Sequence, residues 1–82
     1  MTFYYDFEDR RLHAKVYWPT RGTTISVELV DTRQIREFPS DLIFELKRGR
    51  KISYTLESKD NKRLSELQRI IGKRLQEFVN QM

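Results

Sequence analysis

The stretch Leu64–Met82, with the sequence LSELQRIIGKRLQEFVNQM, decides which fold the rest of the chain can adopt. Its apolar residues follow one another at steps of 3, 4, 4, 3 and 4, which gives the 3.6-residue period of an α-helix with one apolar stripe. At about 100° per residue, this stripe occupies about 80° of arc. It consists of Leu64, Leu67, Ile71, Leu75, Phe78 and Met82. Because such a helix is not stable alone in water, the preceding residues must offer it an apolar surface.

The helix is expected to span about residues 61–81. Asp60 or Asn61 is the expected N-cap, with Ser58 as an alternative, because these side chains accept hydrogen bonds from the free amides of a first helical turn. Gly72 lies on the flank of the stripe, where a glycine costs about 1 kcal/mol relative to alanine. We expect a close approach of the helix backbone to its packing surface to offset this cost.

The outer face of this helix carries acidic and basic residues at helical spacing. Lys62 and Glu66, and likewise Lys73 and Glu77, are four residues apart, so each pair is expected to form an ion pair. The outer face would then be largely neutral. A coiled-coil seam does not continue along the stripe, because its heptad spacing reaches Arg74, so packing on the chain's own sheet is favoured.

Five upstream stretches alternate apolar and polar residues with the period of two that is typical of β-strands with one buried face. They cover residues 3–7, 12–18, 24–29, 42–46 and 52–56. The pattern predicts an α+β fold, in which an antiparallel sheet of about five strands forms a meander and one long C-terminal amphipathic helix packs on one face. We expect a single domain over residues 1–82, strand-rich over 1–57.

The inward residues of neighbouring strands must share a face, which restricts where the three hairpins can turn. The expected turns are Asp9-Arg10, Arg21-Gly22 with a positive φ at the glycine, and the three-residue loop Lys47-Arg48-Gly49 with the glycine left-handed. The resulting cross-strand pairs are Phe7 with Leu12, Val16 with Val27, Trp18 with Ile25, and Phe44 with Ile52.

The stretch from Asp31 to Asp41 has no clear period. Ile35 and Phe38 are its only apolar residues, and Pro39 ends whatever element precedes it. Two alternatives are open for this stretch. It forms a short strand over Gln34–Phe38, or it is a connection that carries the chain to another edge of the sheet.

Composition excludes several classes of protein. The 82 residues include no cysteine, which excludes disulfides, thiolate catalysis and sulfur-ligated metals. The net charge of +4 is unevenly distributed, with four basic and five acidic residues in 1–31 and twelve and seven in 32–82. The N-terminal residues lack the pattern of a signal peptide and no stretch is apolar enough for a membrane span, so we expect a cytoplasmic protein.

Residues that could support catalysis are few. The single histidine, His13, falls on the polar side of its strand without a partner that would make it a general base. The acidic residues Asp6, Glu8 and Asp9 cluster near the first turn, but they lack the spacing and the glycine of a calcium loop. We therefore expect no enzyme, no cofactor, no metal and no small-molecule substrate.

The side of the sheet that faces away from the helix is the first candidate for a functional surface. Tyr4, Tyr17 and Ile43 are expected there, and tyrosine is enriched at protein interfaces because it offers a large rigid area with a polar tip. Ile70 is a second exposed apolar candidate, on the flank of the helix. The favoured function is a small non-catalytic binding module whose partner is another protein or a second copy of the chain.

The alternative function is nucleic-acid binding through the tip of the last hairpin. The basic residues of this tip are Lys47, Arg48, Arg50 and Lys51. Short basic runs of this kind bind phosphates by charge neutralisation and counterion release. Tyr4 and Tyr17 would serve as stacking platforms for bases.

The order of the expected elements, an antiparallel sheet followed by one C-terminal amphipathic helix, is similar to that of pleckstrin-homology-like domains. The similarity covers element order only and no sequence motif carries it. No lipid binding is inferred from it.

Overall fold

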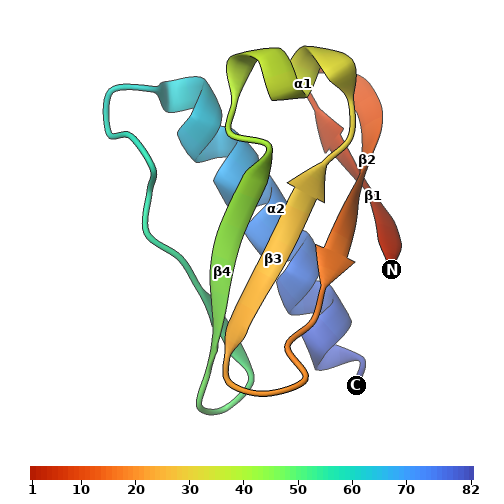
Figure 1. The fold of residues 1–82 in the computed structure, drawn as a ribbon, viewed down its shortest axis with the longest axis vertical. Coiled ribbons are helices and arrows are strands. Elements are labelled where there is room, and N and C mark those ends of the chain that lie inside the picture. The colour runs from red at the N-terminus through yellow and green to blue at the C-terminus, as the bar shows by residue number, and fades with distance from the viewer.

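The computed structural model describes residues 1–82. In chain order the elements are β1 (Thr2–Phe7), β2 (Arg10–Tyr17), β3 (Thr24–Leu29), α1 (Thr32–Glu37), β4 (Asp41–Lys47), β5 (Lys51–Ser53) and α2 (Lys62–Asn80). The five strands form one antiparallel sheet in the order β1-β2-β3-β4-β5. Helix α2 crosses one face of this sheet diagonally, and α1 lies at one end of it (Figure 1). The predicted α+β fold, a meander with one C-terminal helix, is confirmed.

The core lies between α2 and the inward face of the sheet, where every second residue of the first three strands is buried. The apolar residues that α2 buries are Leu64, Leu67, Ile71, Leu75 and Val79. The expected stripe is therefore wrong at its end. Met82 is 66% exposed, because the helix ends at Asn80, and Phe78 is only partly buried.

The first hairpin turns at Glu8-Asp9 and not at the expected Asp9-Arg10. Leu12 consequently pairs with Tyr5 rather than with Phe7, a shift of two residues in the register. A shift of two leaves every side chain on its original face, so the burial pattern alone does not distinguish these registers. The φ angles of 49° and 62° at the two central residues are those of a type I′ turn.

The second hairpin matches its prediction in part. Val16 pairs with Val27 as expected, and Gly22 has a positive φ of 78°. The ladder ends before Trp18, which does not form the expected pair with Ile25. The proline that follows this tryptophan has no N–H with which to continue the ladder.

The third hairpin has a three-residue loop, as expected, with its glycine at a positive φ of 81°. The loop consists of Arg48-Gly49-Arg50 and not of Lys47-Arg48-Gly49. Ile52 therefore pairs with Leu46, two residues from the expected partner Phe44. As in the first hairpin, the shift preserves which face each side chain occupies.

Neither alternative for the stretch between β3 and β4 is right. It forms the short helix α1, whose N-cap Asp31 accepts hydrogen bonds from the main-chain amides of Arg33 and Gln34 at 3.0 and 3.2 Å. No strand forms over Gln34–Phe38, and the chain does not move to another edge, because β4 pairs directly with β3. The capping aspartate was the signal for this helix.

Helix α2 begins and packs as expected. Asn61 is its N-cap and accepts a hydrogen bond from the Leu64 amide at 3.0 Å. A Cβ at Gly72 would lie 2.9 Å from Cε1 of Tyr54, which confirms the close approach of the helix backbone to its packing surface.

Neither helix of the structure has both the length and the apolar character that crossing a membrane requires.

The ion pairs on the surface of α2 differ from the expected ones. Glu66 pairs with Arg69 at 3.0 Å, and Glu77 pairs with Arg74 at 3.4 Å. Both pairs have i,i+3 spacing, and the expected lysine partners of these two carboxylates are not used. The outer face of the helix is therefore not neutral as expected, because Lys62 and Lys73 take part in no ion pair.

Candidate functional site

The face of the sheet opposite α2, here called the open face, is covered by neither helix and points toward the viewer in Figure 1. Strand pairing arranges its side chains in rows that run across the strands. Successive rows are Thr2, Lys15, Glu28 and Asp41, then Tyr17, Ser26 and Ile43, then Thr24, Glu45 and Ser53, and finally Lys47 and Lys51.

The structure brings two of the three expected interaction residues together. Tyr17 and Ile43 lie in one row on either side of Ser26, so roughly 10 Å separates their backbones. Tyr17 is 52% exposed and Ile43 is 46% exposed. The Tyr17 hydroxyl donates a hydrogen bond to Oε1 of Glu28 at 3.2 Å, and this bond raises the pKa of Tyr17. The tyrosine ring is therefore held against the sheet by a partner in the neighbouring strand.

Tyr4 is also exposed, but it lies apart from this pair. It faces His13, with 6.1 Å between the ring centroids, and His13 is four residues from Tyr17 along β2. This places Tyr4 roughly 13 Å from the row of Tyr17 along the strand direction. Its carbonyl oxygen accepts a hydrogen bond from Nε of Arg74 at 2.9 Å. The outward orientation of all three residues is confirmed, whereas their role in binding stays a prediction.

A depression of about 270 Å³ adjoins Ile43 on the open face. Its lining residues are Ile43, Glu45, Lys47, Ser53, Tyr54, Thr55 and Glu57. It exists because β5 ends at Ser53, short of the expected Leu56, so the chain beyond that point no longer pairs with β4. Sequence reasoning did not assign Glu45 or Glu57 to a site, because it continued the last strand to Leu56 and so predicted no depression here.

Two glutamines of α2 bind β5 and the segment that follows it. Gln76 accepts a hydrogen bond from the Ile52 amide and donates one to the Arg50 carbonyl, both at 2.8 Å. The buried side chain of Gln68 donates to the Thr55 carbonyl and accepts from the amide of Glu57, both at 3.1 Å. Gln76 thus satisfies main-chain groups within and just before β5, whereas Gln68 satisfies groups beyond Ser53 that a longer strand would pair with β4, and Gln68 fixes one side of the depression.

Carboxylates line the depression next to its apolar residue. Glu45 accepts hydrogen bonds from the hydroxyls of Thr23 and Thr24 at 2.7 and 3.1 Å, and these bonds lower its pKa. Glu57 and Lys47 complete the charged part of the lining. Chemically, the depression suits an aliphatic side chain that is flanked by a basic group.

The four basic residues of the alternative site lie at the expected hairpin tip. All are exposed, and Lys47 faces Lys51 directly across β4 and β5. Arg50 differs from the others, because its Nη1 donates to the Met82 main-chain oxygen at 2.6 Å. The tip is therefore tied to the end of α2 through Arg50, while Arg48 has no hydrogen-bonding partner.

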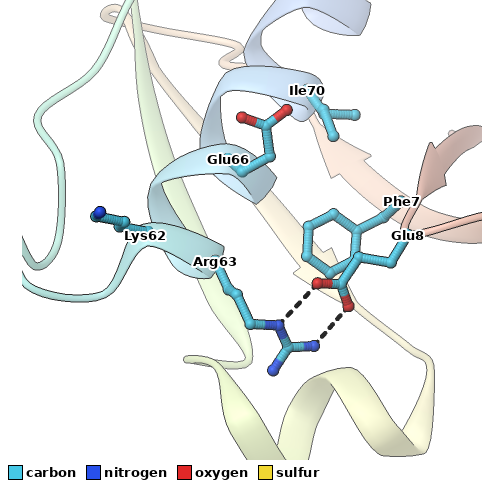
Figure 2. Close-up of a pocket in the computed structure, with 6 residues that line it drawn as sticks. All are labelled: Phe7, Glu8, Lys62, Arg63, Glu66 and Ile70. Atoms are coloured by element: carbon cyan, nitrogen blue, oxygen red, sulfur yellow. Dashed lines mark hydrogen bonds and ion pairs between the residues drawn. The ribbon is translucent and has the colours of Figure 1, made fainter.

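A second depression, of about 340 Å³, lies at the start of α2 (Figure 2). Its lining residues are Phe7, Glu8, Lys62, Arg63, Glu66 and Ile70. Arg63 points toward Glu8 and binds both of its carboxylate oxygens, whereas the Lys62 side chain points away from the others. Ile70, expected to be exposed, is partly buried against the core. Glu8 and Arg63 pair with each other and Glu66 pairs with Arg69, so three of the four charged groups are already neutralised and the depression is a junction between elements.

The residues considered for catalysis or metal binding are separated by the fold. Asp6 pairs with Arg11 at 3.4 Å, and Glu8 pairs with Arg63 at 2.6 Å. His13 is exposed on the open face beside the ring of Tyr4.

No family model, curated protein or solved structure matches this chain.

Proposed function

We propose that this protein is a small non-catalytic binding module that binds a protein partner through the open face of its sheet. The observation that carries this proposal is the row formed by Tyr17 and Ile43, two half-exposed apolar side chains beside a depression. Large apolar side chains in the centre of a polar surface are the usual anchors of protein interfaces.

The fixed position of Tyr17 supports an anchoring role. Its hydroxyl is hydrogen bonded to Glu28, so the ring has already lost part of its conformational freedom before a partner arrives. A side chain that is ordered in the free protein loses less entropy on binding, which favours affinity. The ring face stays available for contact while the polar tip keeps its partner.

The depression indicates the chemistry of the partner. Ile43 provides an apolar wall, and Glu45 and Glu57 provide carboxylates beside it. We therefore propose a partner segment that inserts an aliphatic side chain next to a lysine or arginine. A second copy of the chain is one candidate for this partner.

Sedimentation of the wild type and of Tyr17→Ser/Ile43→Ser over a range of concentrations tests self-association. The matched control is Ile35→Ser, which removes an exposed isoleucine from α1, outside the row. Concentration-dependent assembly that the first variant abolishes and the control retains would support a second copy as partner. If the wild type stays monomeric, and both variants co-purify the same proteins as the wild type, the open face is not the binding surface.

We further propose that the module acts in the cytoplasm. The absence of cysteine fits a reducing compartment. A non-catalytic role fits the surroundings of His13, the only histidine, which has an aromatic neighbour instead of an acid–base partner.

A further inference from the structure

We infer that one end of the molecule, distinct from the row of Tyr17 and Ile43, binds the phosphate backbone of nucleic acid. This basic end consists of Arg21, Lys47, Arg48 and Lys51. The connection between β2 and β3 and the hairpin between β4 and β5 lie at the same end of the sheet, at the bottom of Figure 1. The fold thus adds an arginine from a distant part of the chain to the basic hairpin tip.

The two loops are held together by specific contacts. The Leu46 amide donates to the Thr23 carbonyl at 2.8 Å, and the Thr23 hydroxyl donates to Glu45 at 2.7 Å. Arg21 is two residues from Thr23. The backbone at Arg21 is therefore anchored beside the hairpin tip, which adds a fifth cation to this end of the molecule along with Arg50.

The cations of the basic end have no acidic partners. None of the four takes part in an ion pair, whereas Arg10, Arg11, Arg63, Arg69 and Arg74 all pair with carboxylates elsewhere in the molecule. The carboxylate of Glu45 accepts two hydroxyl hydrogen bonds, and the charge of Lys47 also contributes to lowering its pKa, so Glu45 offsets part of the charge of Lys47 alone. The basic end thus gathers, in two neighbouring loops, four of the cations that form no ion pair.

The opposition of Lys47 and Lys51 gives a second reason for an anionic ligand. Like charges directly opposite each other on paired strands destabilise a sheet. An anion bound between the two ammonium groups would relieve this repulsion. The arrangement therefore costs stability in the free protein and is favourable in a complex with a polyanion.

The composition of the two loops favours nucleic acid over an anionic membrane. The one large apolar side chain of these loops, Trp18, is partly buried against the core, and residues 20–23 and 47–51 contain none that could insert between lipids. Surface binding to membranes ordinarily combines basic residues with such insertion. A phosphate backbone needs only closely spaced cations, and it releases a counterion for each phosphate that is neutralised.

Fluorescence anisotropy of a short labelled DNA duplex of mixed sequence tests this inference. With about four phosphate contacts, raising the salt from about 50 to 200 mM should weaken binding by roughly a hundredfold. Arg48→Glu/Lys51→Glu should weaken binding at least roughly tenfold at low salt and reduce the salt slope by about two. The matched control, Arg33→Glu/Arg36→Glu, makes the same change of net charge on α1 at the other end of the sheet and should retain binding.

Misfolding would not explain a loss of binding in the first variant. Lys51→Glu replaces the cross-strand repulsion by an attraction, so its thermal midpoint should be equal to or above that of the wild type. Tyr17→Ser/Ile43→Ser should bind the duplex as the wild type does, which separates this inference from the proposed protein-binding function.

Three outcomes would overturn the inference. The first is the absence of binding at low salt. The second is an equal loss in the variant and in the α1 control, which would assign binding to net charge alone. The third is competition by phosphatidylserine vesicles as effective, per anionic group, as that by unlabelled duplex, which would assign the basic end to membranes.

Discussion

Arg63 and Glu8 are joined by two parallel hydrogen bonds, from Nε to Oε2 at 2.8 Å and from Nη2 to Oε1 at 2.6 Å, across 55 residues of sequence. The same guanidinium also donates to Glu37 and lies over the rings of Phe7 and Phe38, 6.0 and 5.5 Å from their centroids. One side chain of α2 therefore fixes the position of the first hairpin turn and of α1.

Replacing Glu8 by glutamine should remove a pH-dependent part of the stability. The hydrogen bond from Arg63 lowers the pKa of Glu8 below its ordinary value of 4.5, so the ionised carboxylate stabilises the folded state. This contribution is present above pH 4.5 and is lost as the pH falls through the lower folded pKa. Urea unfolding of the wild type over this acidic range should show a decline in stability that Glu8→Gln flattens.

Asp9→Asn is the matched control for this experiment. Asp9 is the neighbouring acidic residue of the same turn, and it forms no ion pair. Its replacement should leave the acid dependence of the wild type unchanged. An identical acid profile for Glu8→Gln and the wild type would contradict the assigned role of the Arg63 pair.

Gly72→Ala should destabilise the protein although alanine is the better helix former. The added Cβ would lie 2.9 Å from Cε1 of Tyr54 and 3.4 Å from Cε2 of Phe44. Overpacking of this kind costs about 1–3 kcal/mol, and the gain in helix propensity offsets about 1 kcal/mol of it. We expect a net loss of about 1 kcal/mol in the free energy of unfolding, measured by urea denaturation.

A double-mutant cycle identifies the cause of that loss. In the background Tyr54→Ala the ring is absent, so Gly72→Ala should be neutral or stabilising. If the substitution is equally costly in both backgrounds, contact with the Tyr54 ring is not what requires glycine at this position.

The elements that sequence reasoning predicted correctly are those with a long hydrophobic period. The spacing of Leu64, Leu67, Ile71 and Leu75 requires one apolar surface for the helix to pack on. Five stretches of alternating apolar and polar residues predict that surface, the buried face of a sheet. The glycine on the flank of the stripe was correctly interpreted as a close approach, because a helical glycine needs an offsetting gain. These inferences depend on local spacing, which the sequence contains.

The features that sequence reasoning missed are ones that the spacing of apolar residues along the chain does not determine. Two hairpin registers were wrong by two residues, because such a shift does not change which side chains are buried. Helix α1 has six residues, too few to show a hydrophobic period, and its N-cap Asp31 was the one residue in the sequence that indicated a helix. The contact between Arg63 and Glu8 joins residues that only the complete fold brings together.

The candidate binding face was predictable only in part. Side chains alternate between the two faces along each strand, which places Tyr17 and Ile43 on the outer side, and the structure confirms that orientation. The depression beside Ile43 was not predictable, because it depends on where β5 ends. Beyond that end the chain is bound by Gln68, a polar residue at a position that the helical spacing places near the stripe.

Tyr5 should stay protonated well into the alkaline range. Burial, followed by the negative charge of Asp31, raises the pKa of Tyr5 to about 12, and its hydroxyl donates to Oε1 of the buried Gln34 at 3.4 Å. A raised pKa means that the neutral form stabilises the fold. This contribution is complete below pH 10 and is lost as the pH rises toward 12. The stability difference between the wild type and Tyr5→Phe, measured by chemical denaturation, should therefore shift in favour of the variant over that interval. A difference that stays constant with pH would show that the hydroxyl titrates normally.

Gln68→Ala should release the segment that borders the depression on the open face. The side chain of Gln68 is 1% exposed and supplies hydrogen bonds to the Thr55 carbonyl and the Glu57 amide. Losing two part-buried hydrogen bonds, at about 0.5–1.5 kcal/mol each, costs roughly 1–3 kcal/mol. We expect a loss of this size in the free energy of unfolding, together with faster hydrogen exchange at the Glu57 amide. The matched control is Gln81→Ala, since that glutamine is exposed and its side chain forms no hydrogen bond. Unchanged protection of the Glu57 amide in Gln68→Ala would mean that something other than Gln68 holds this segment away from β4.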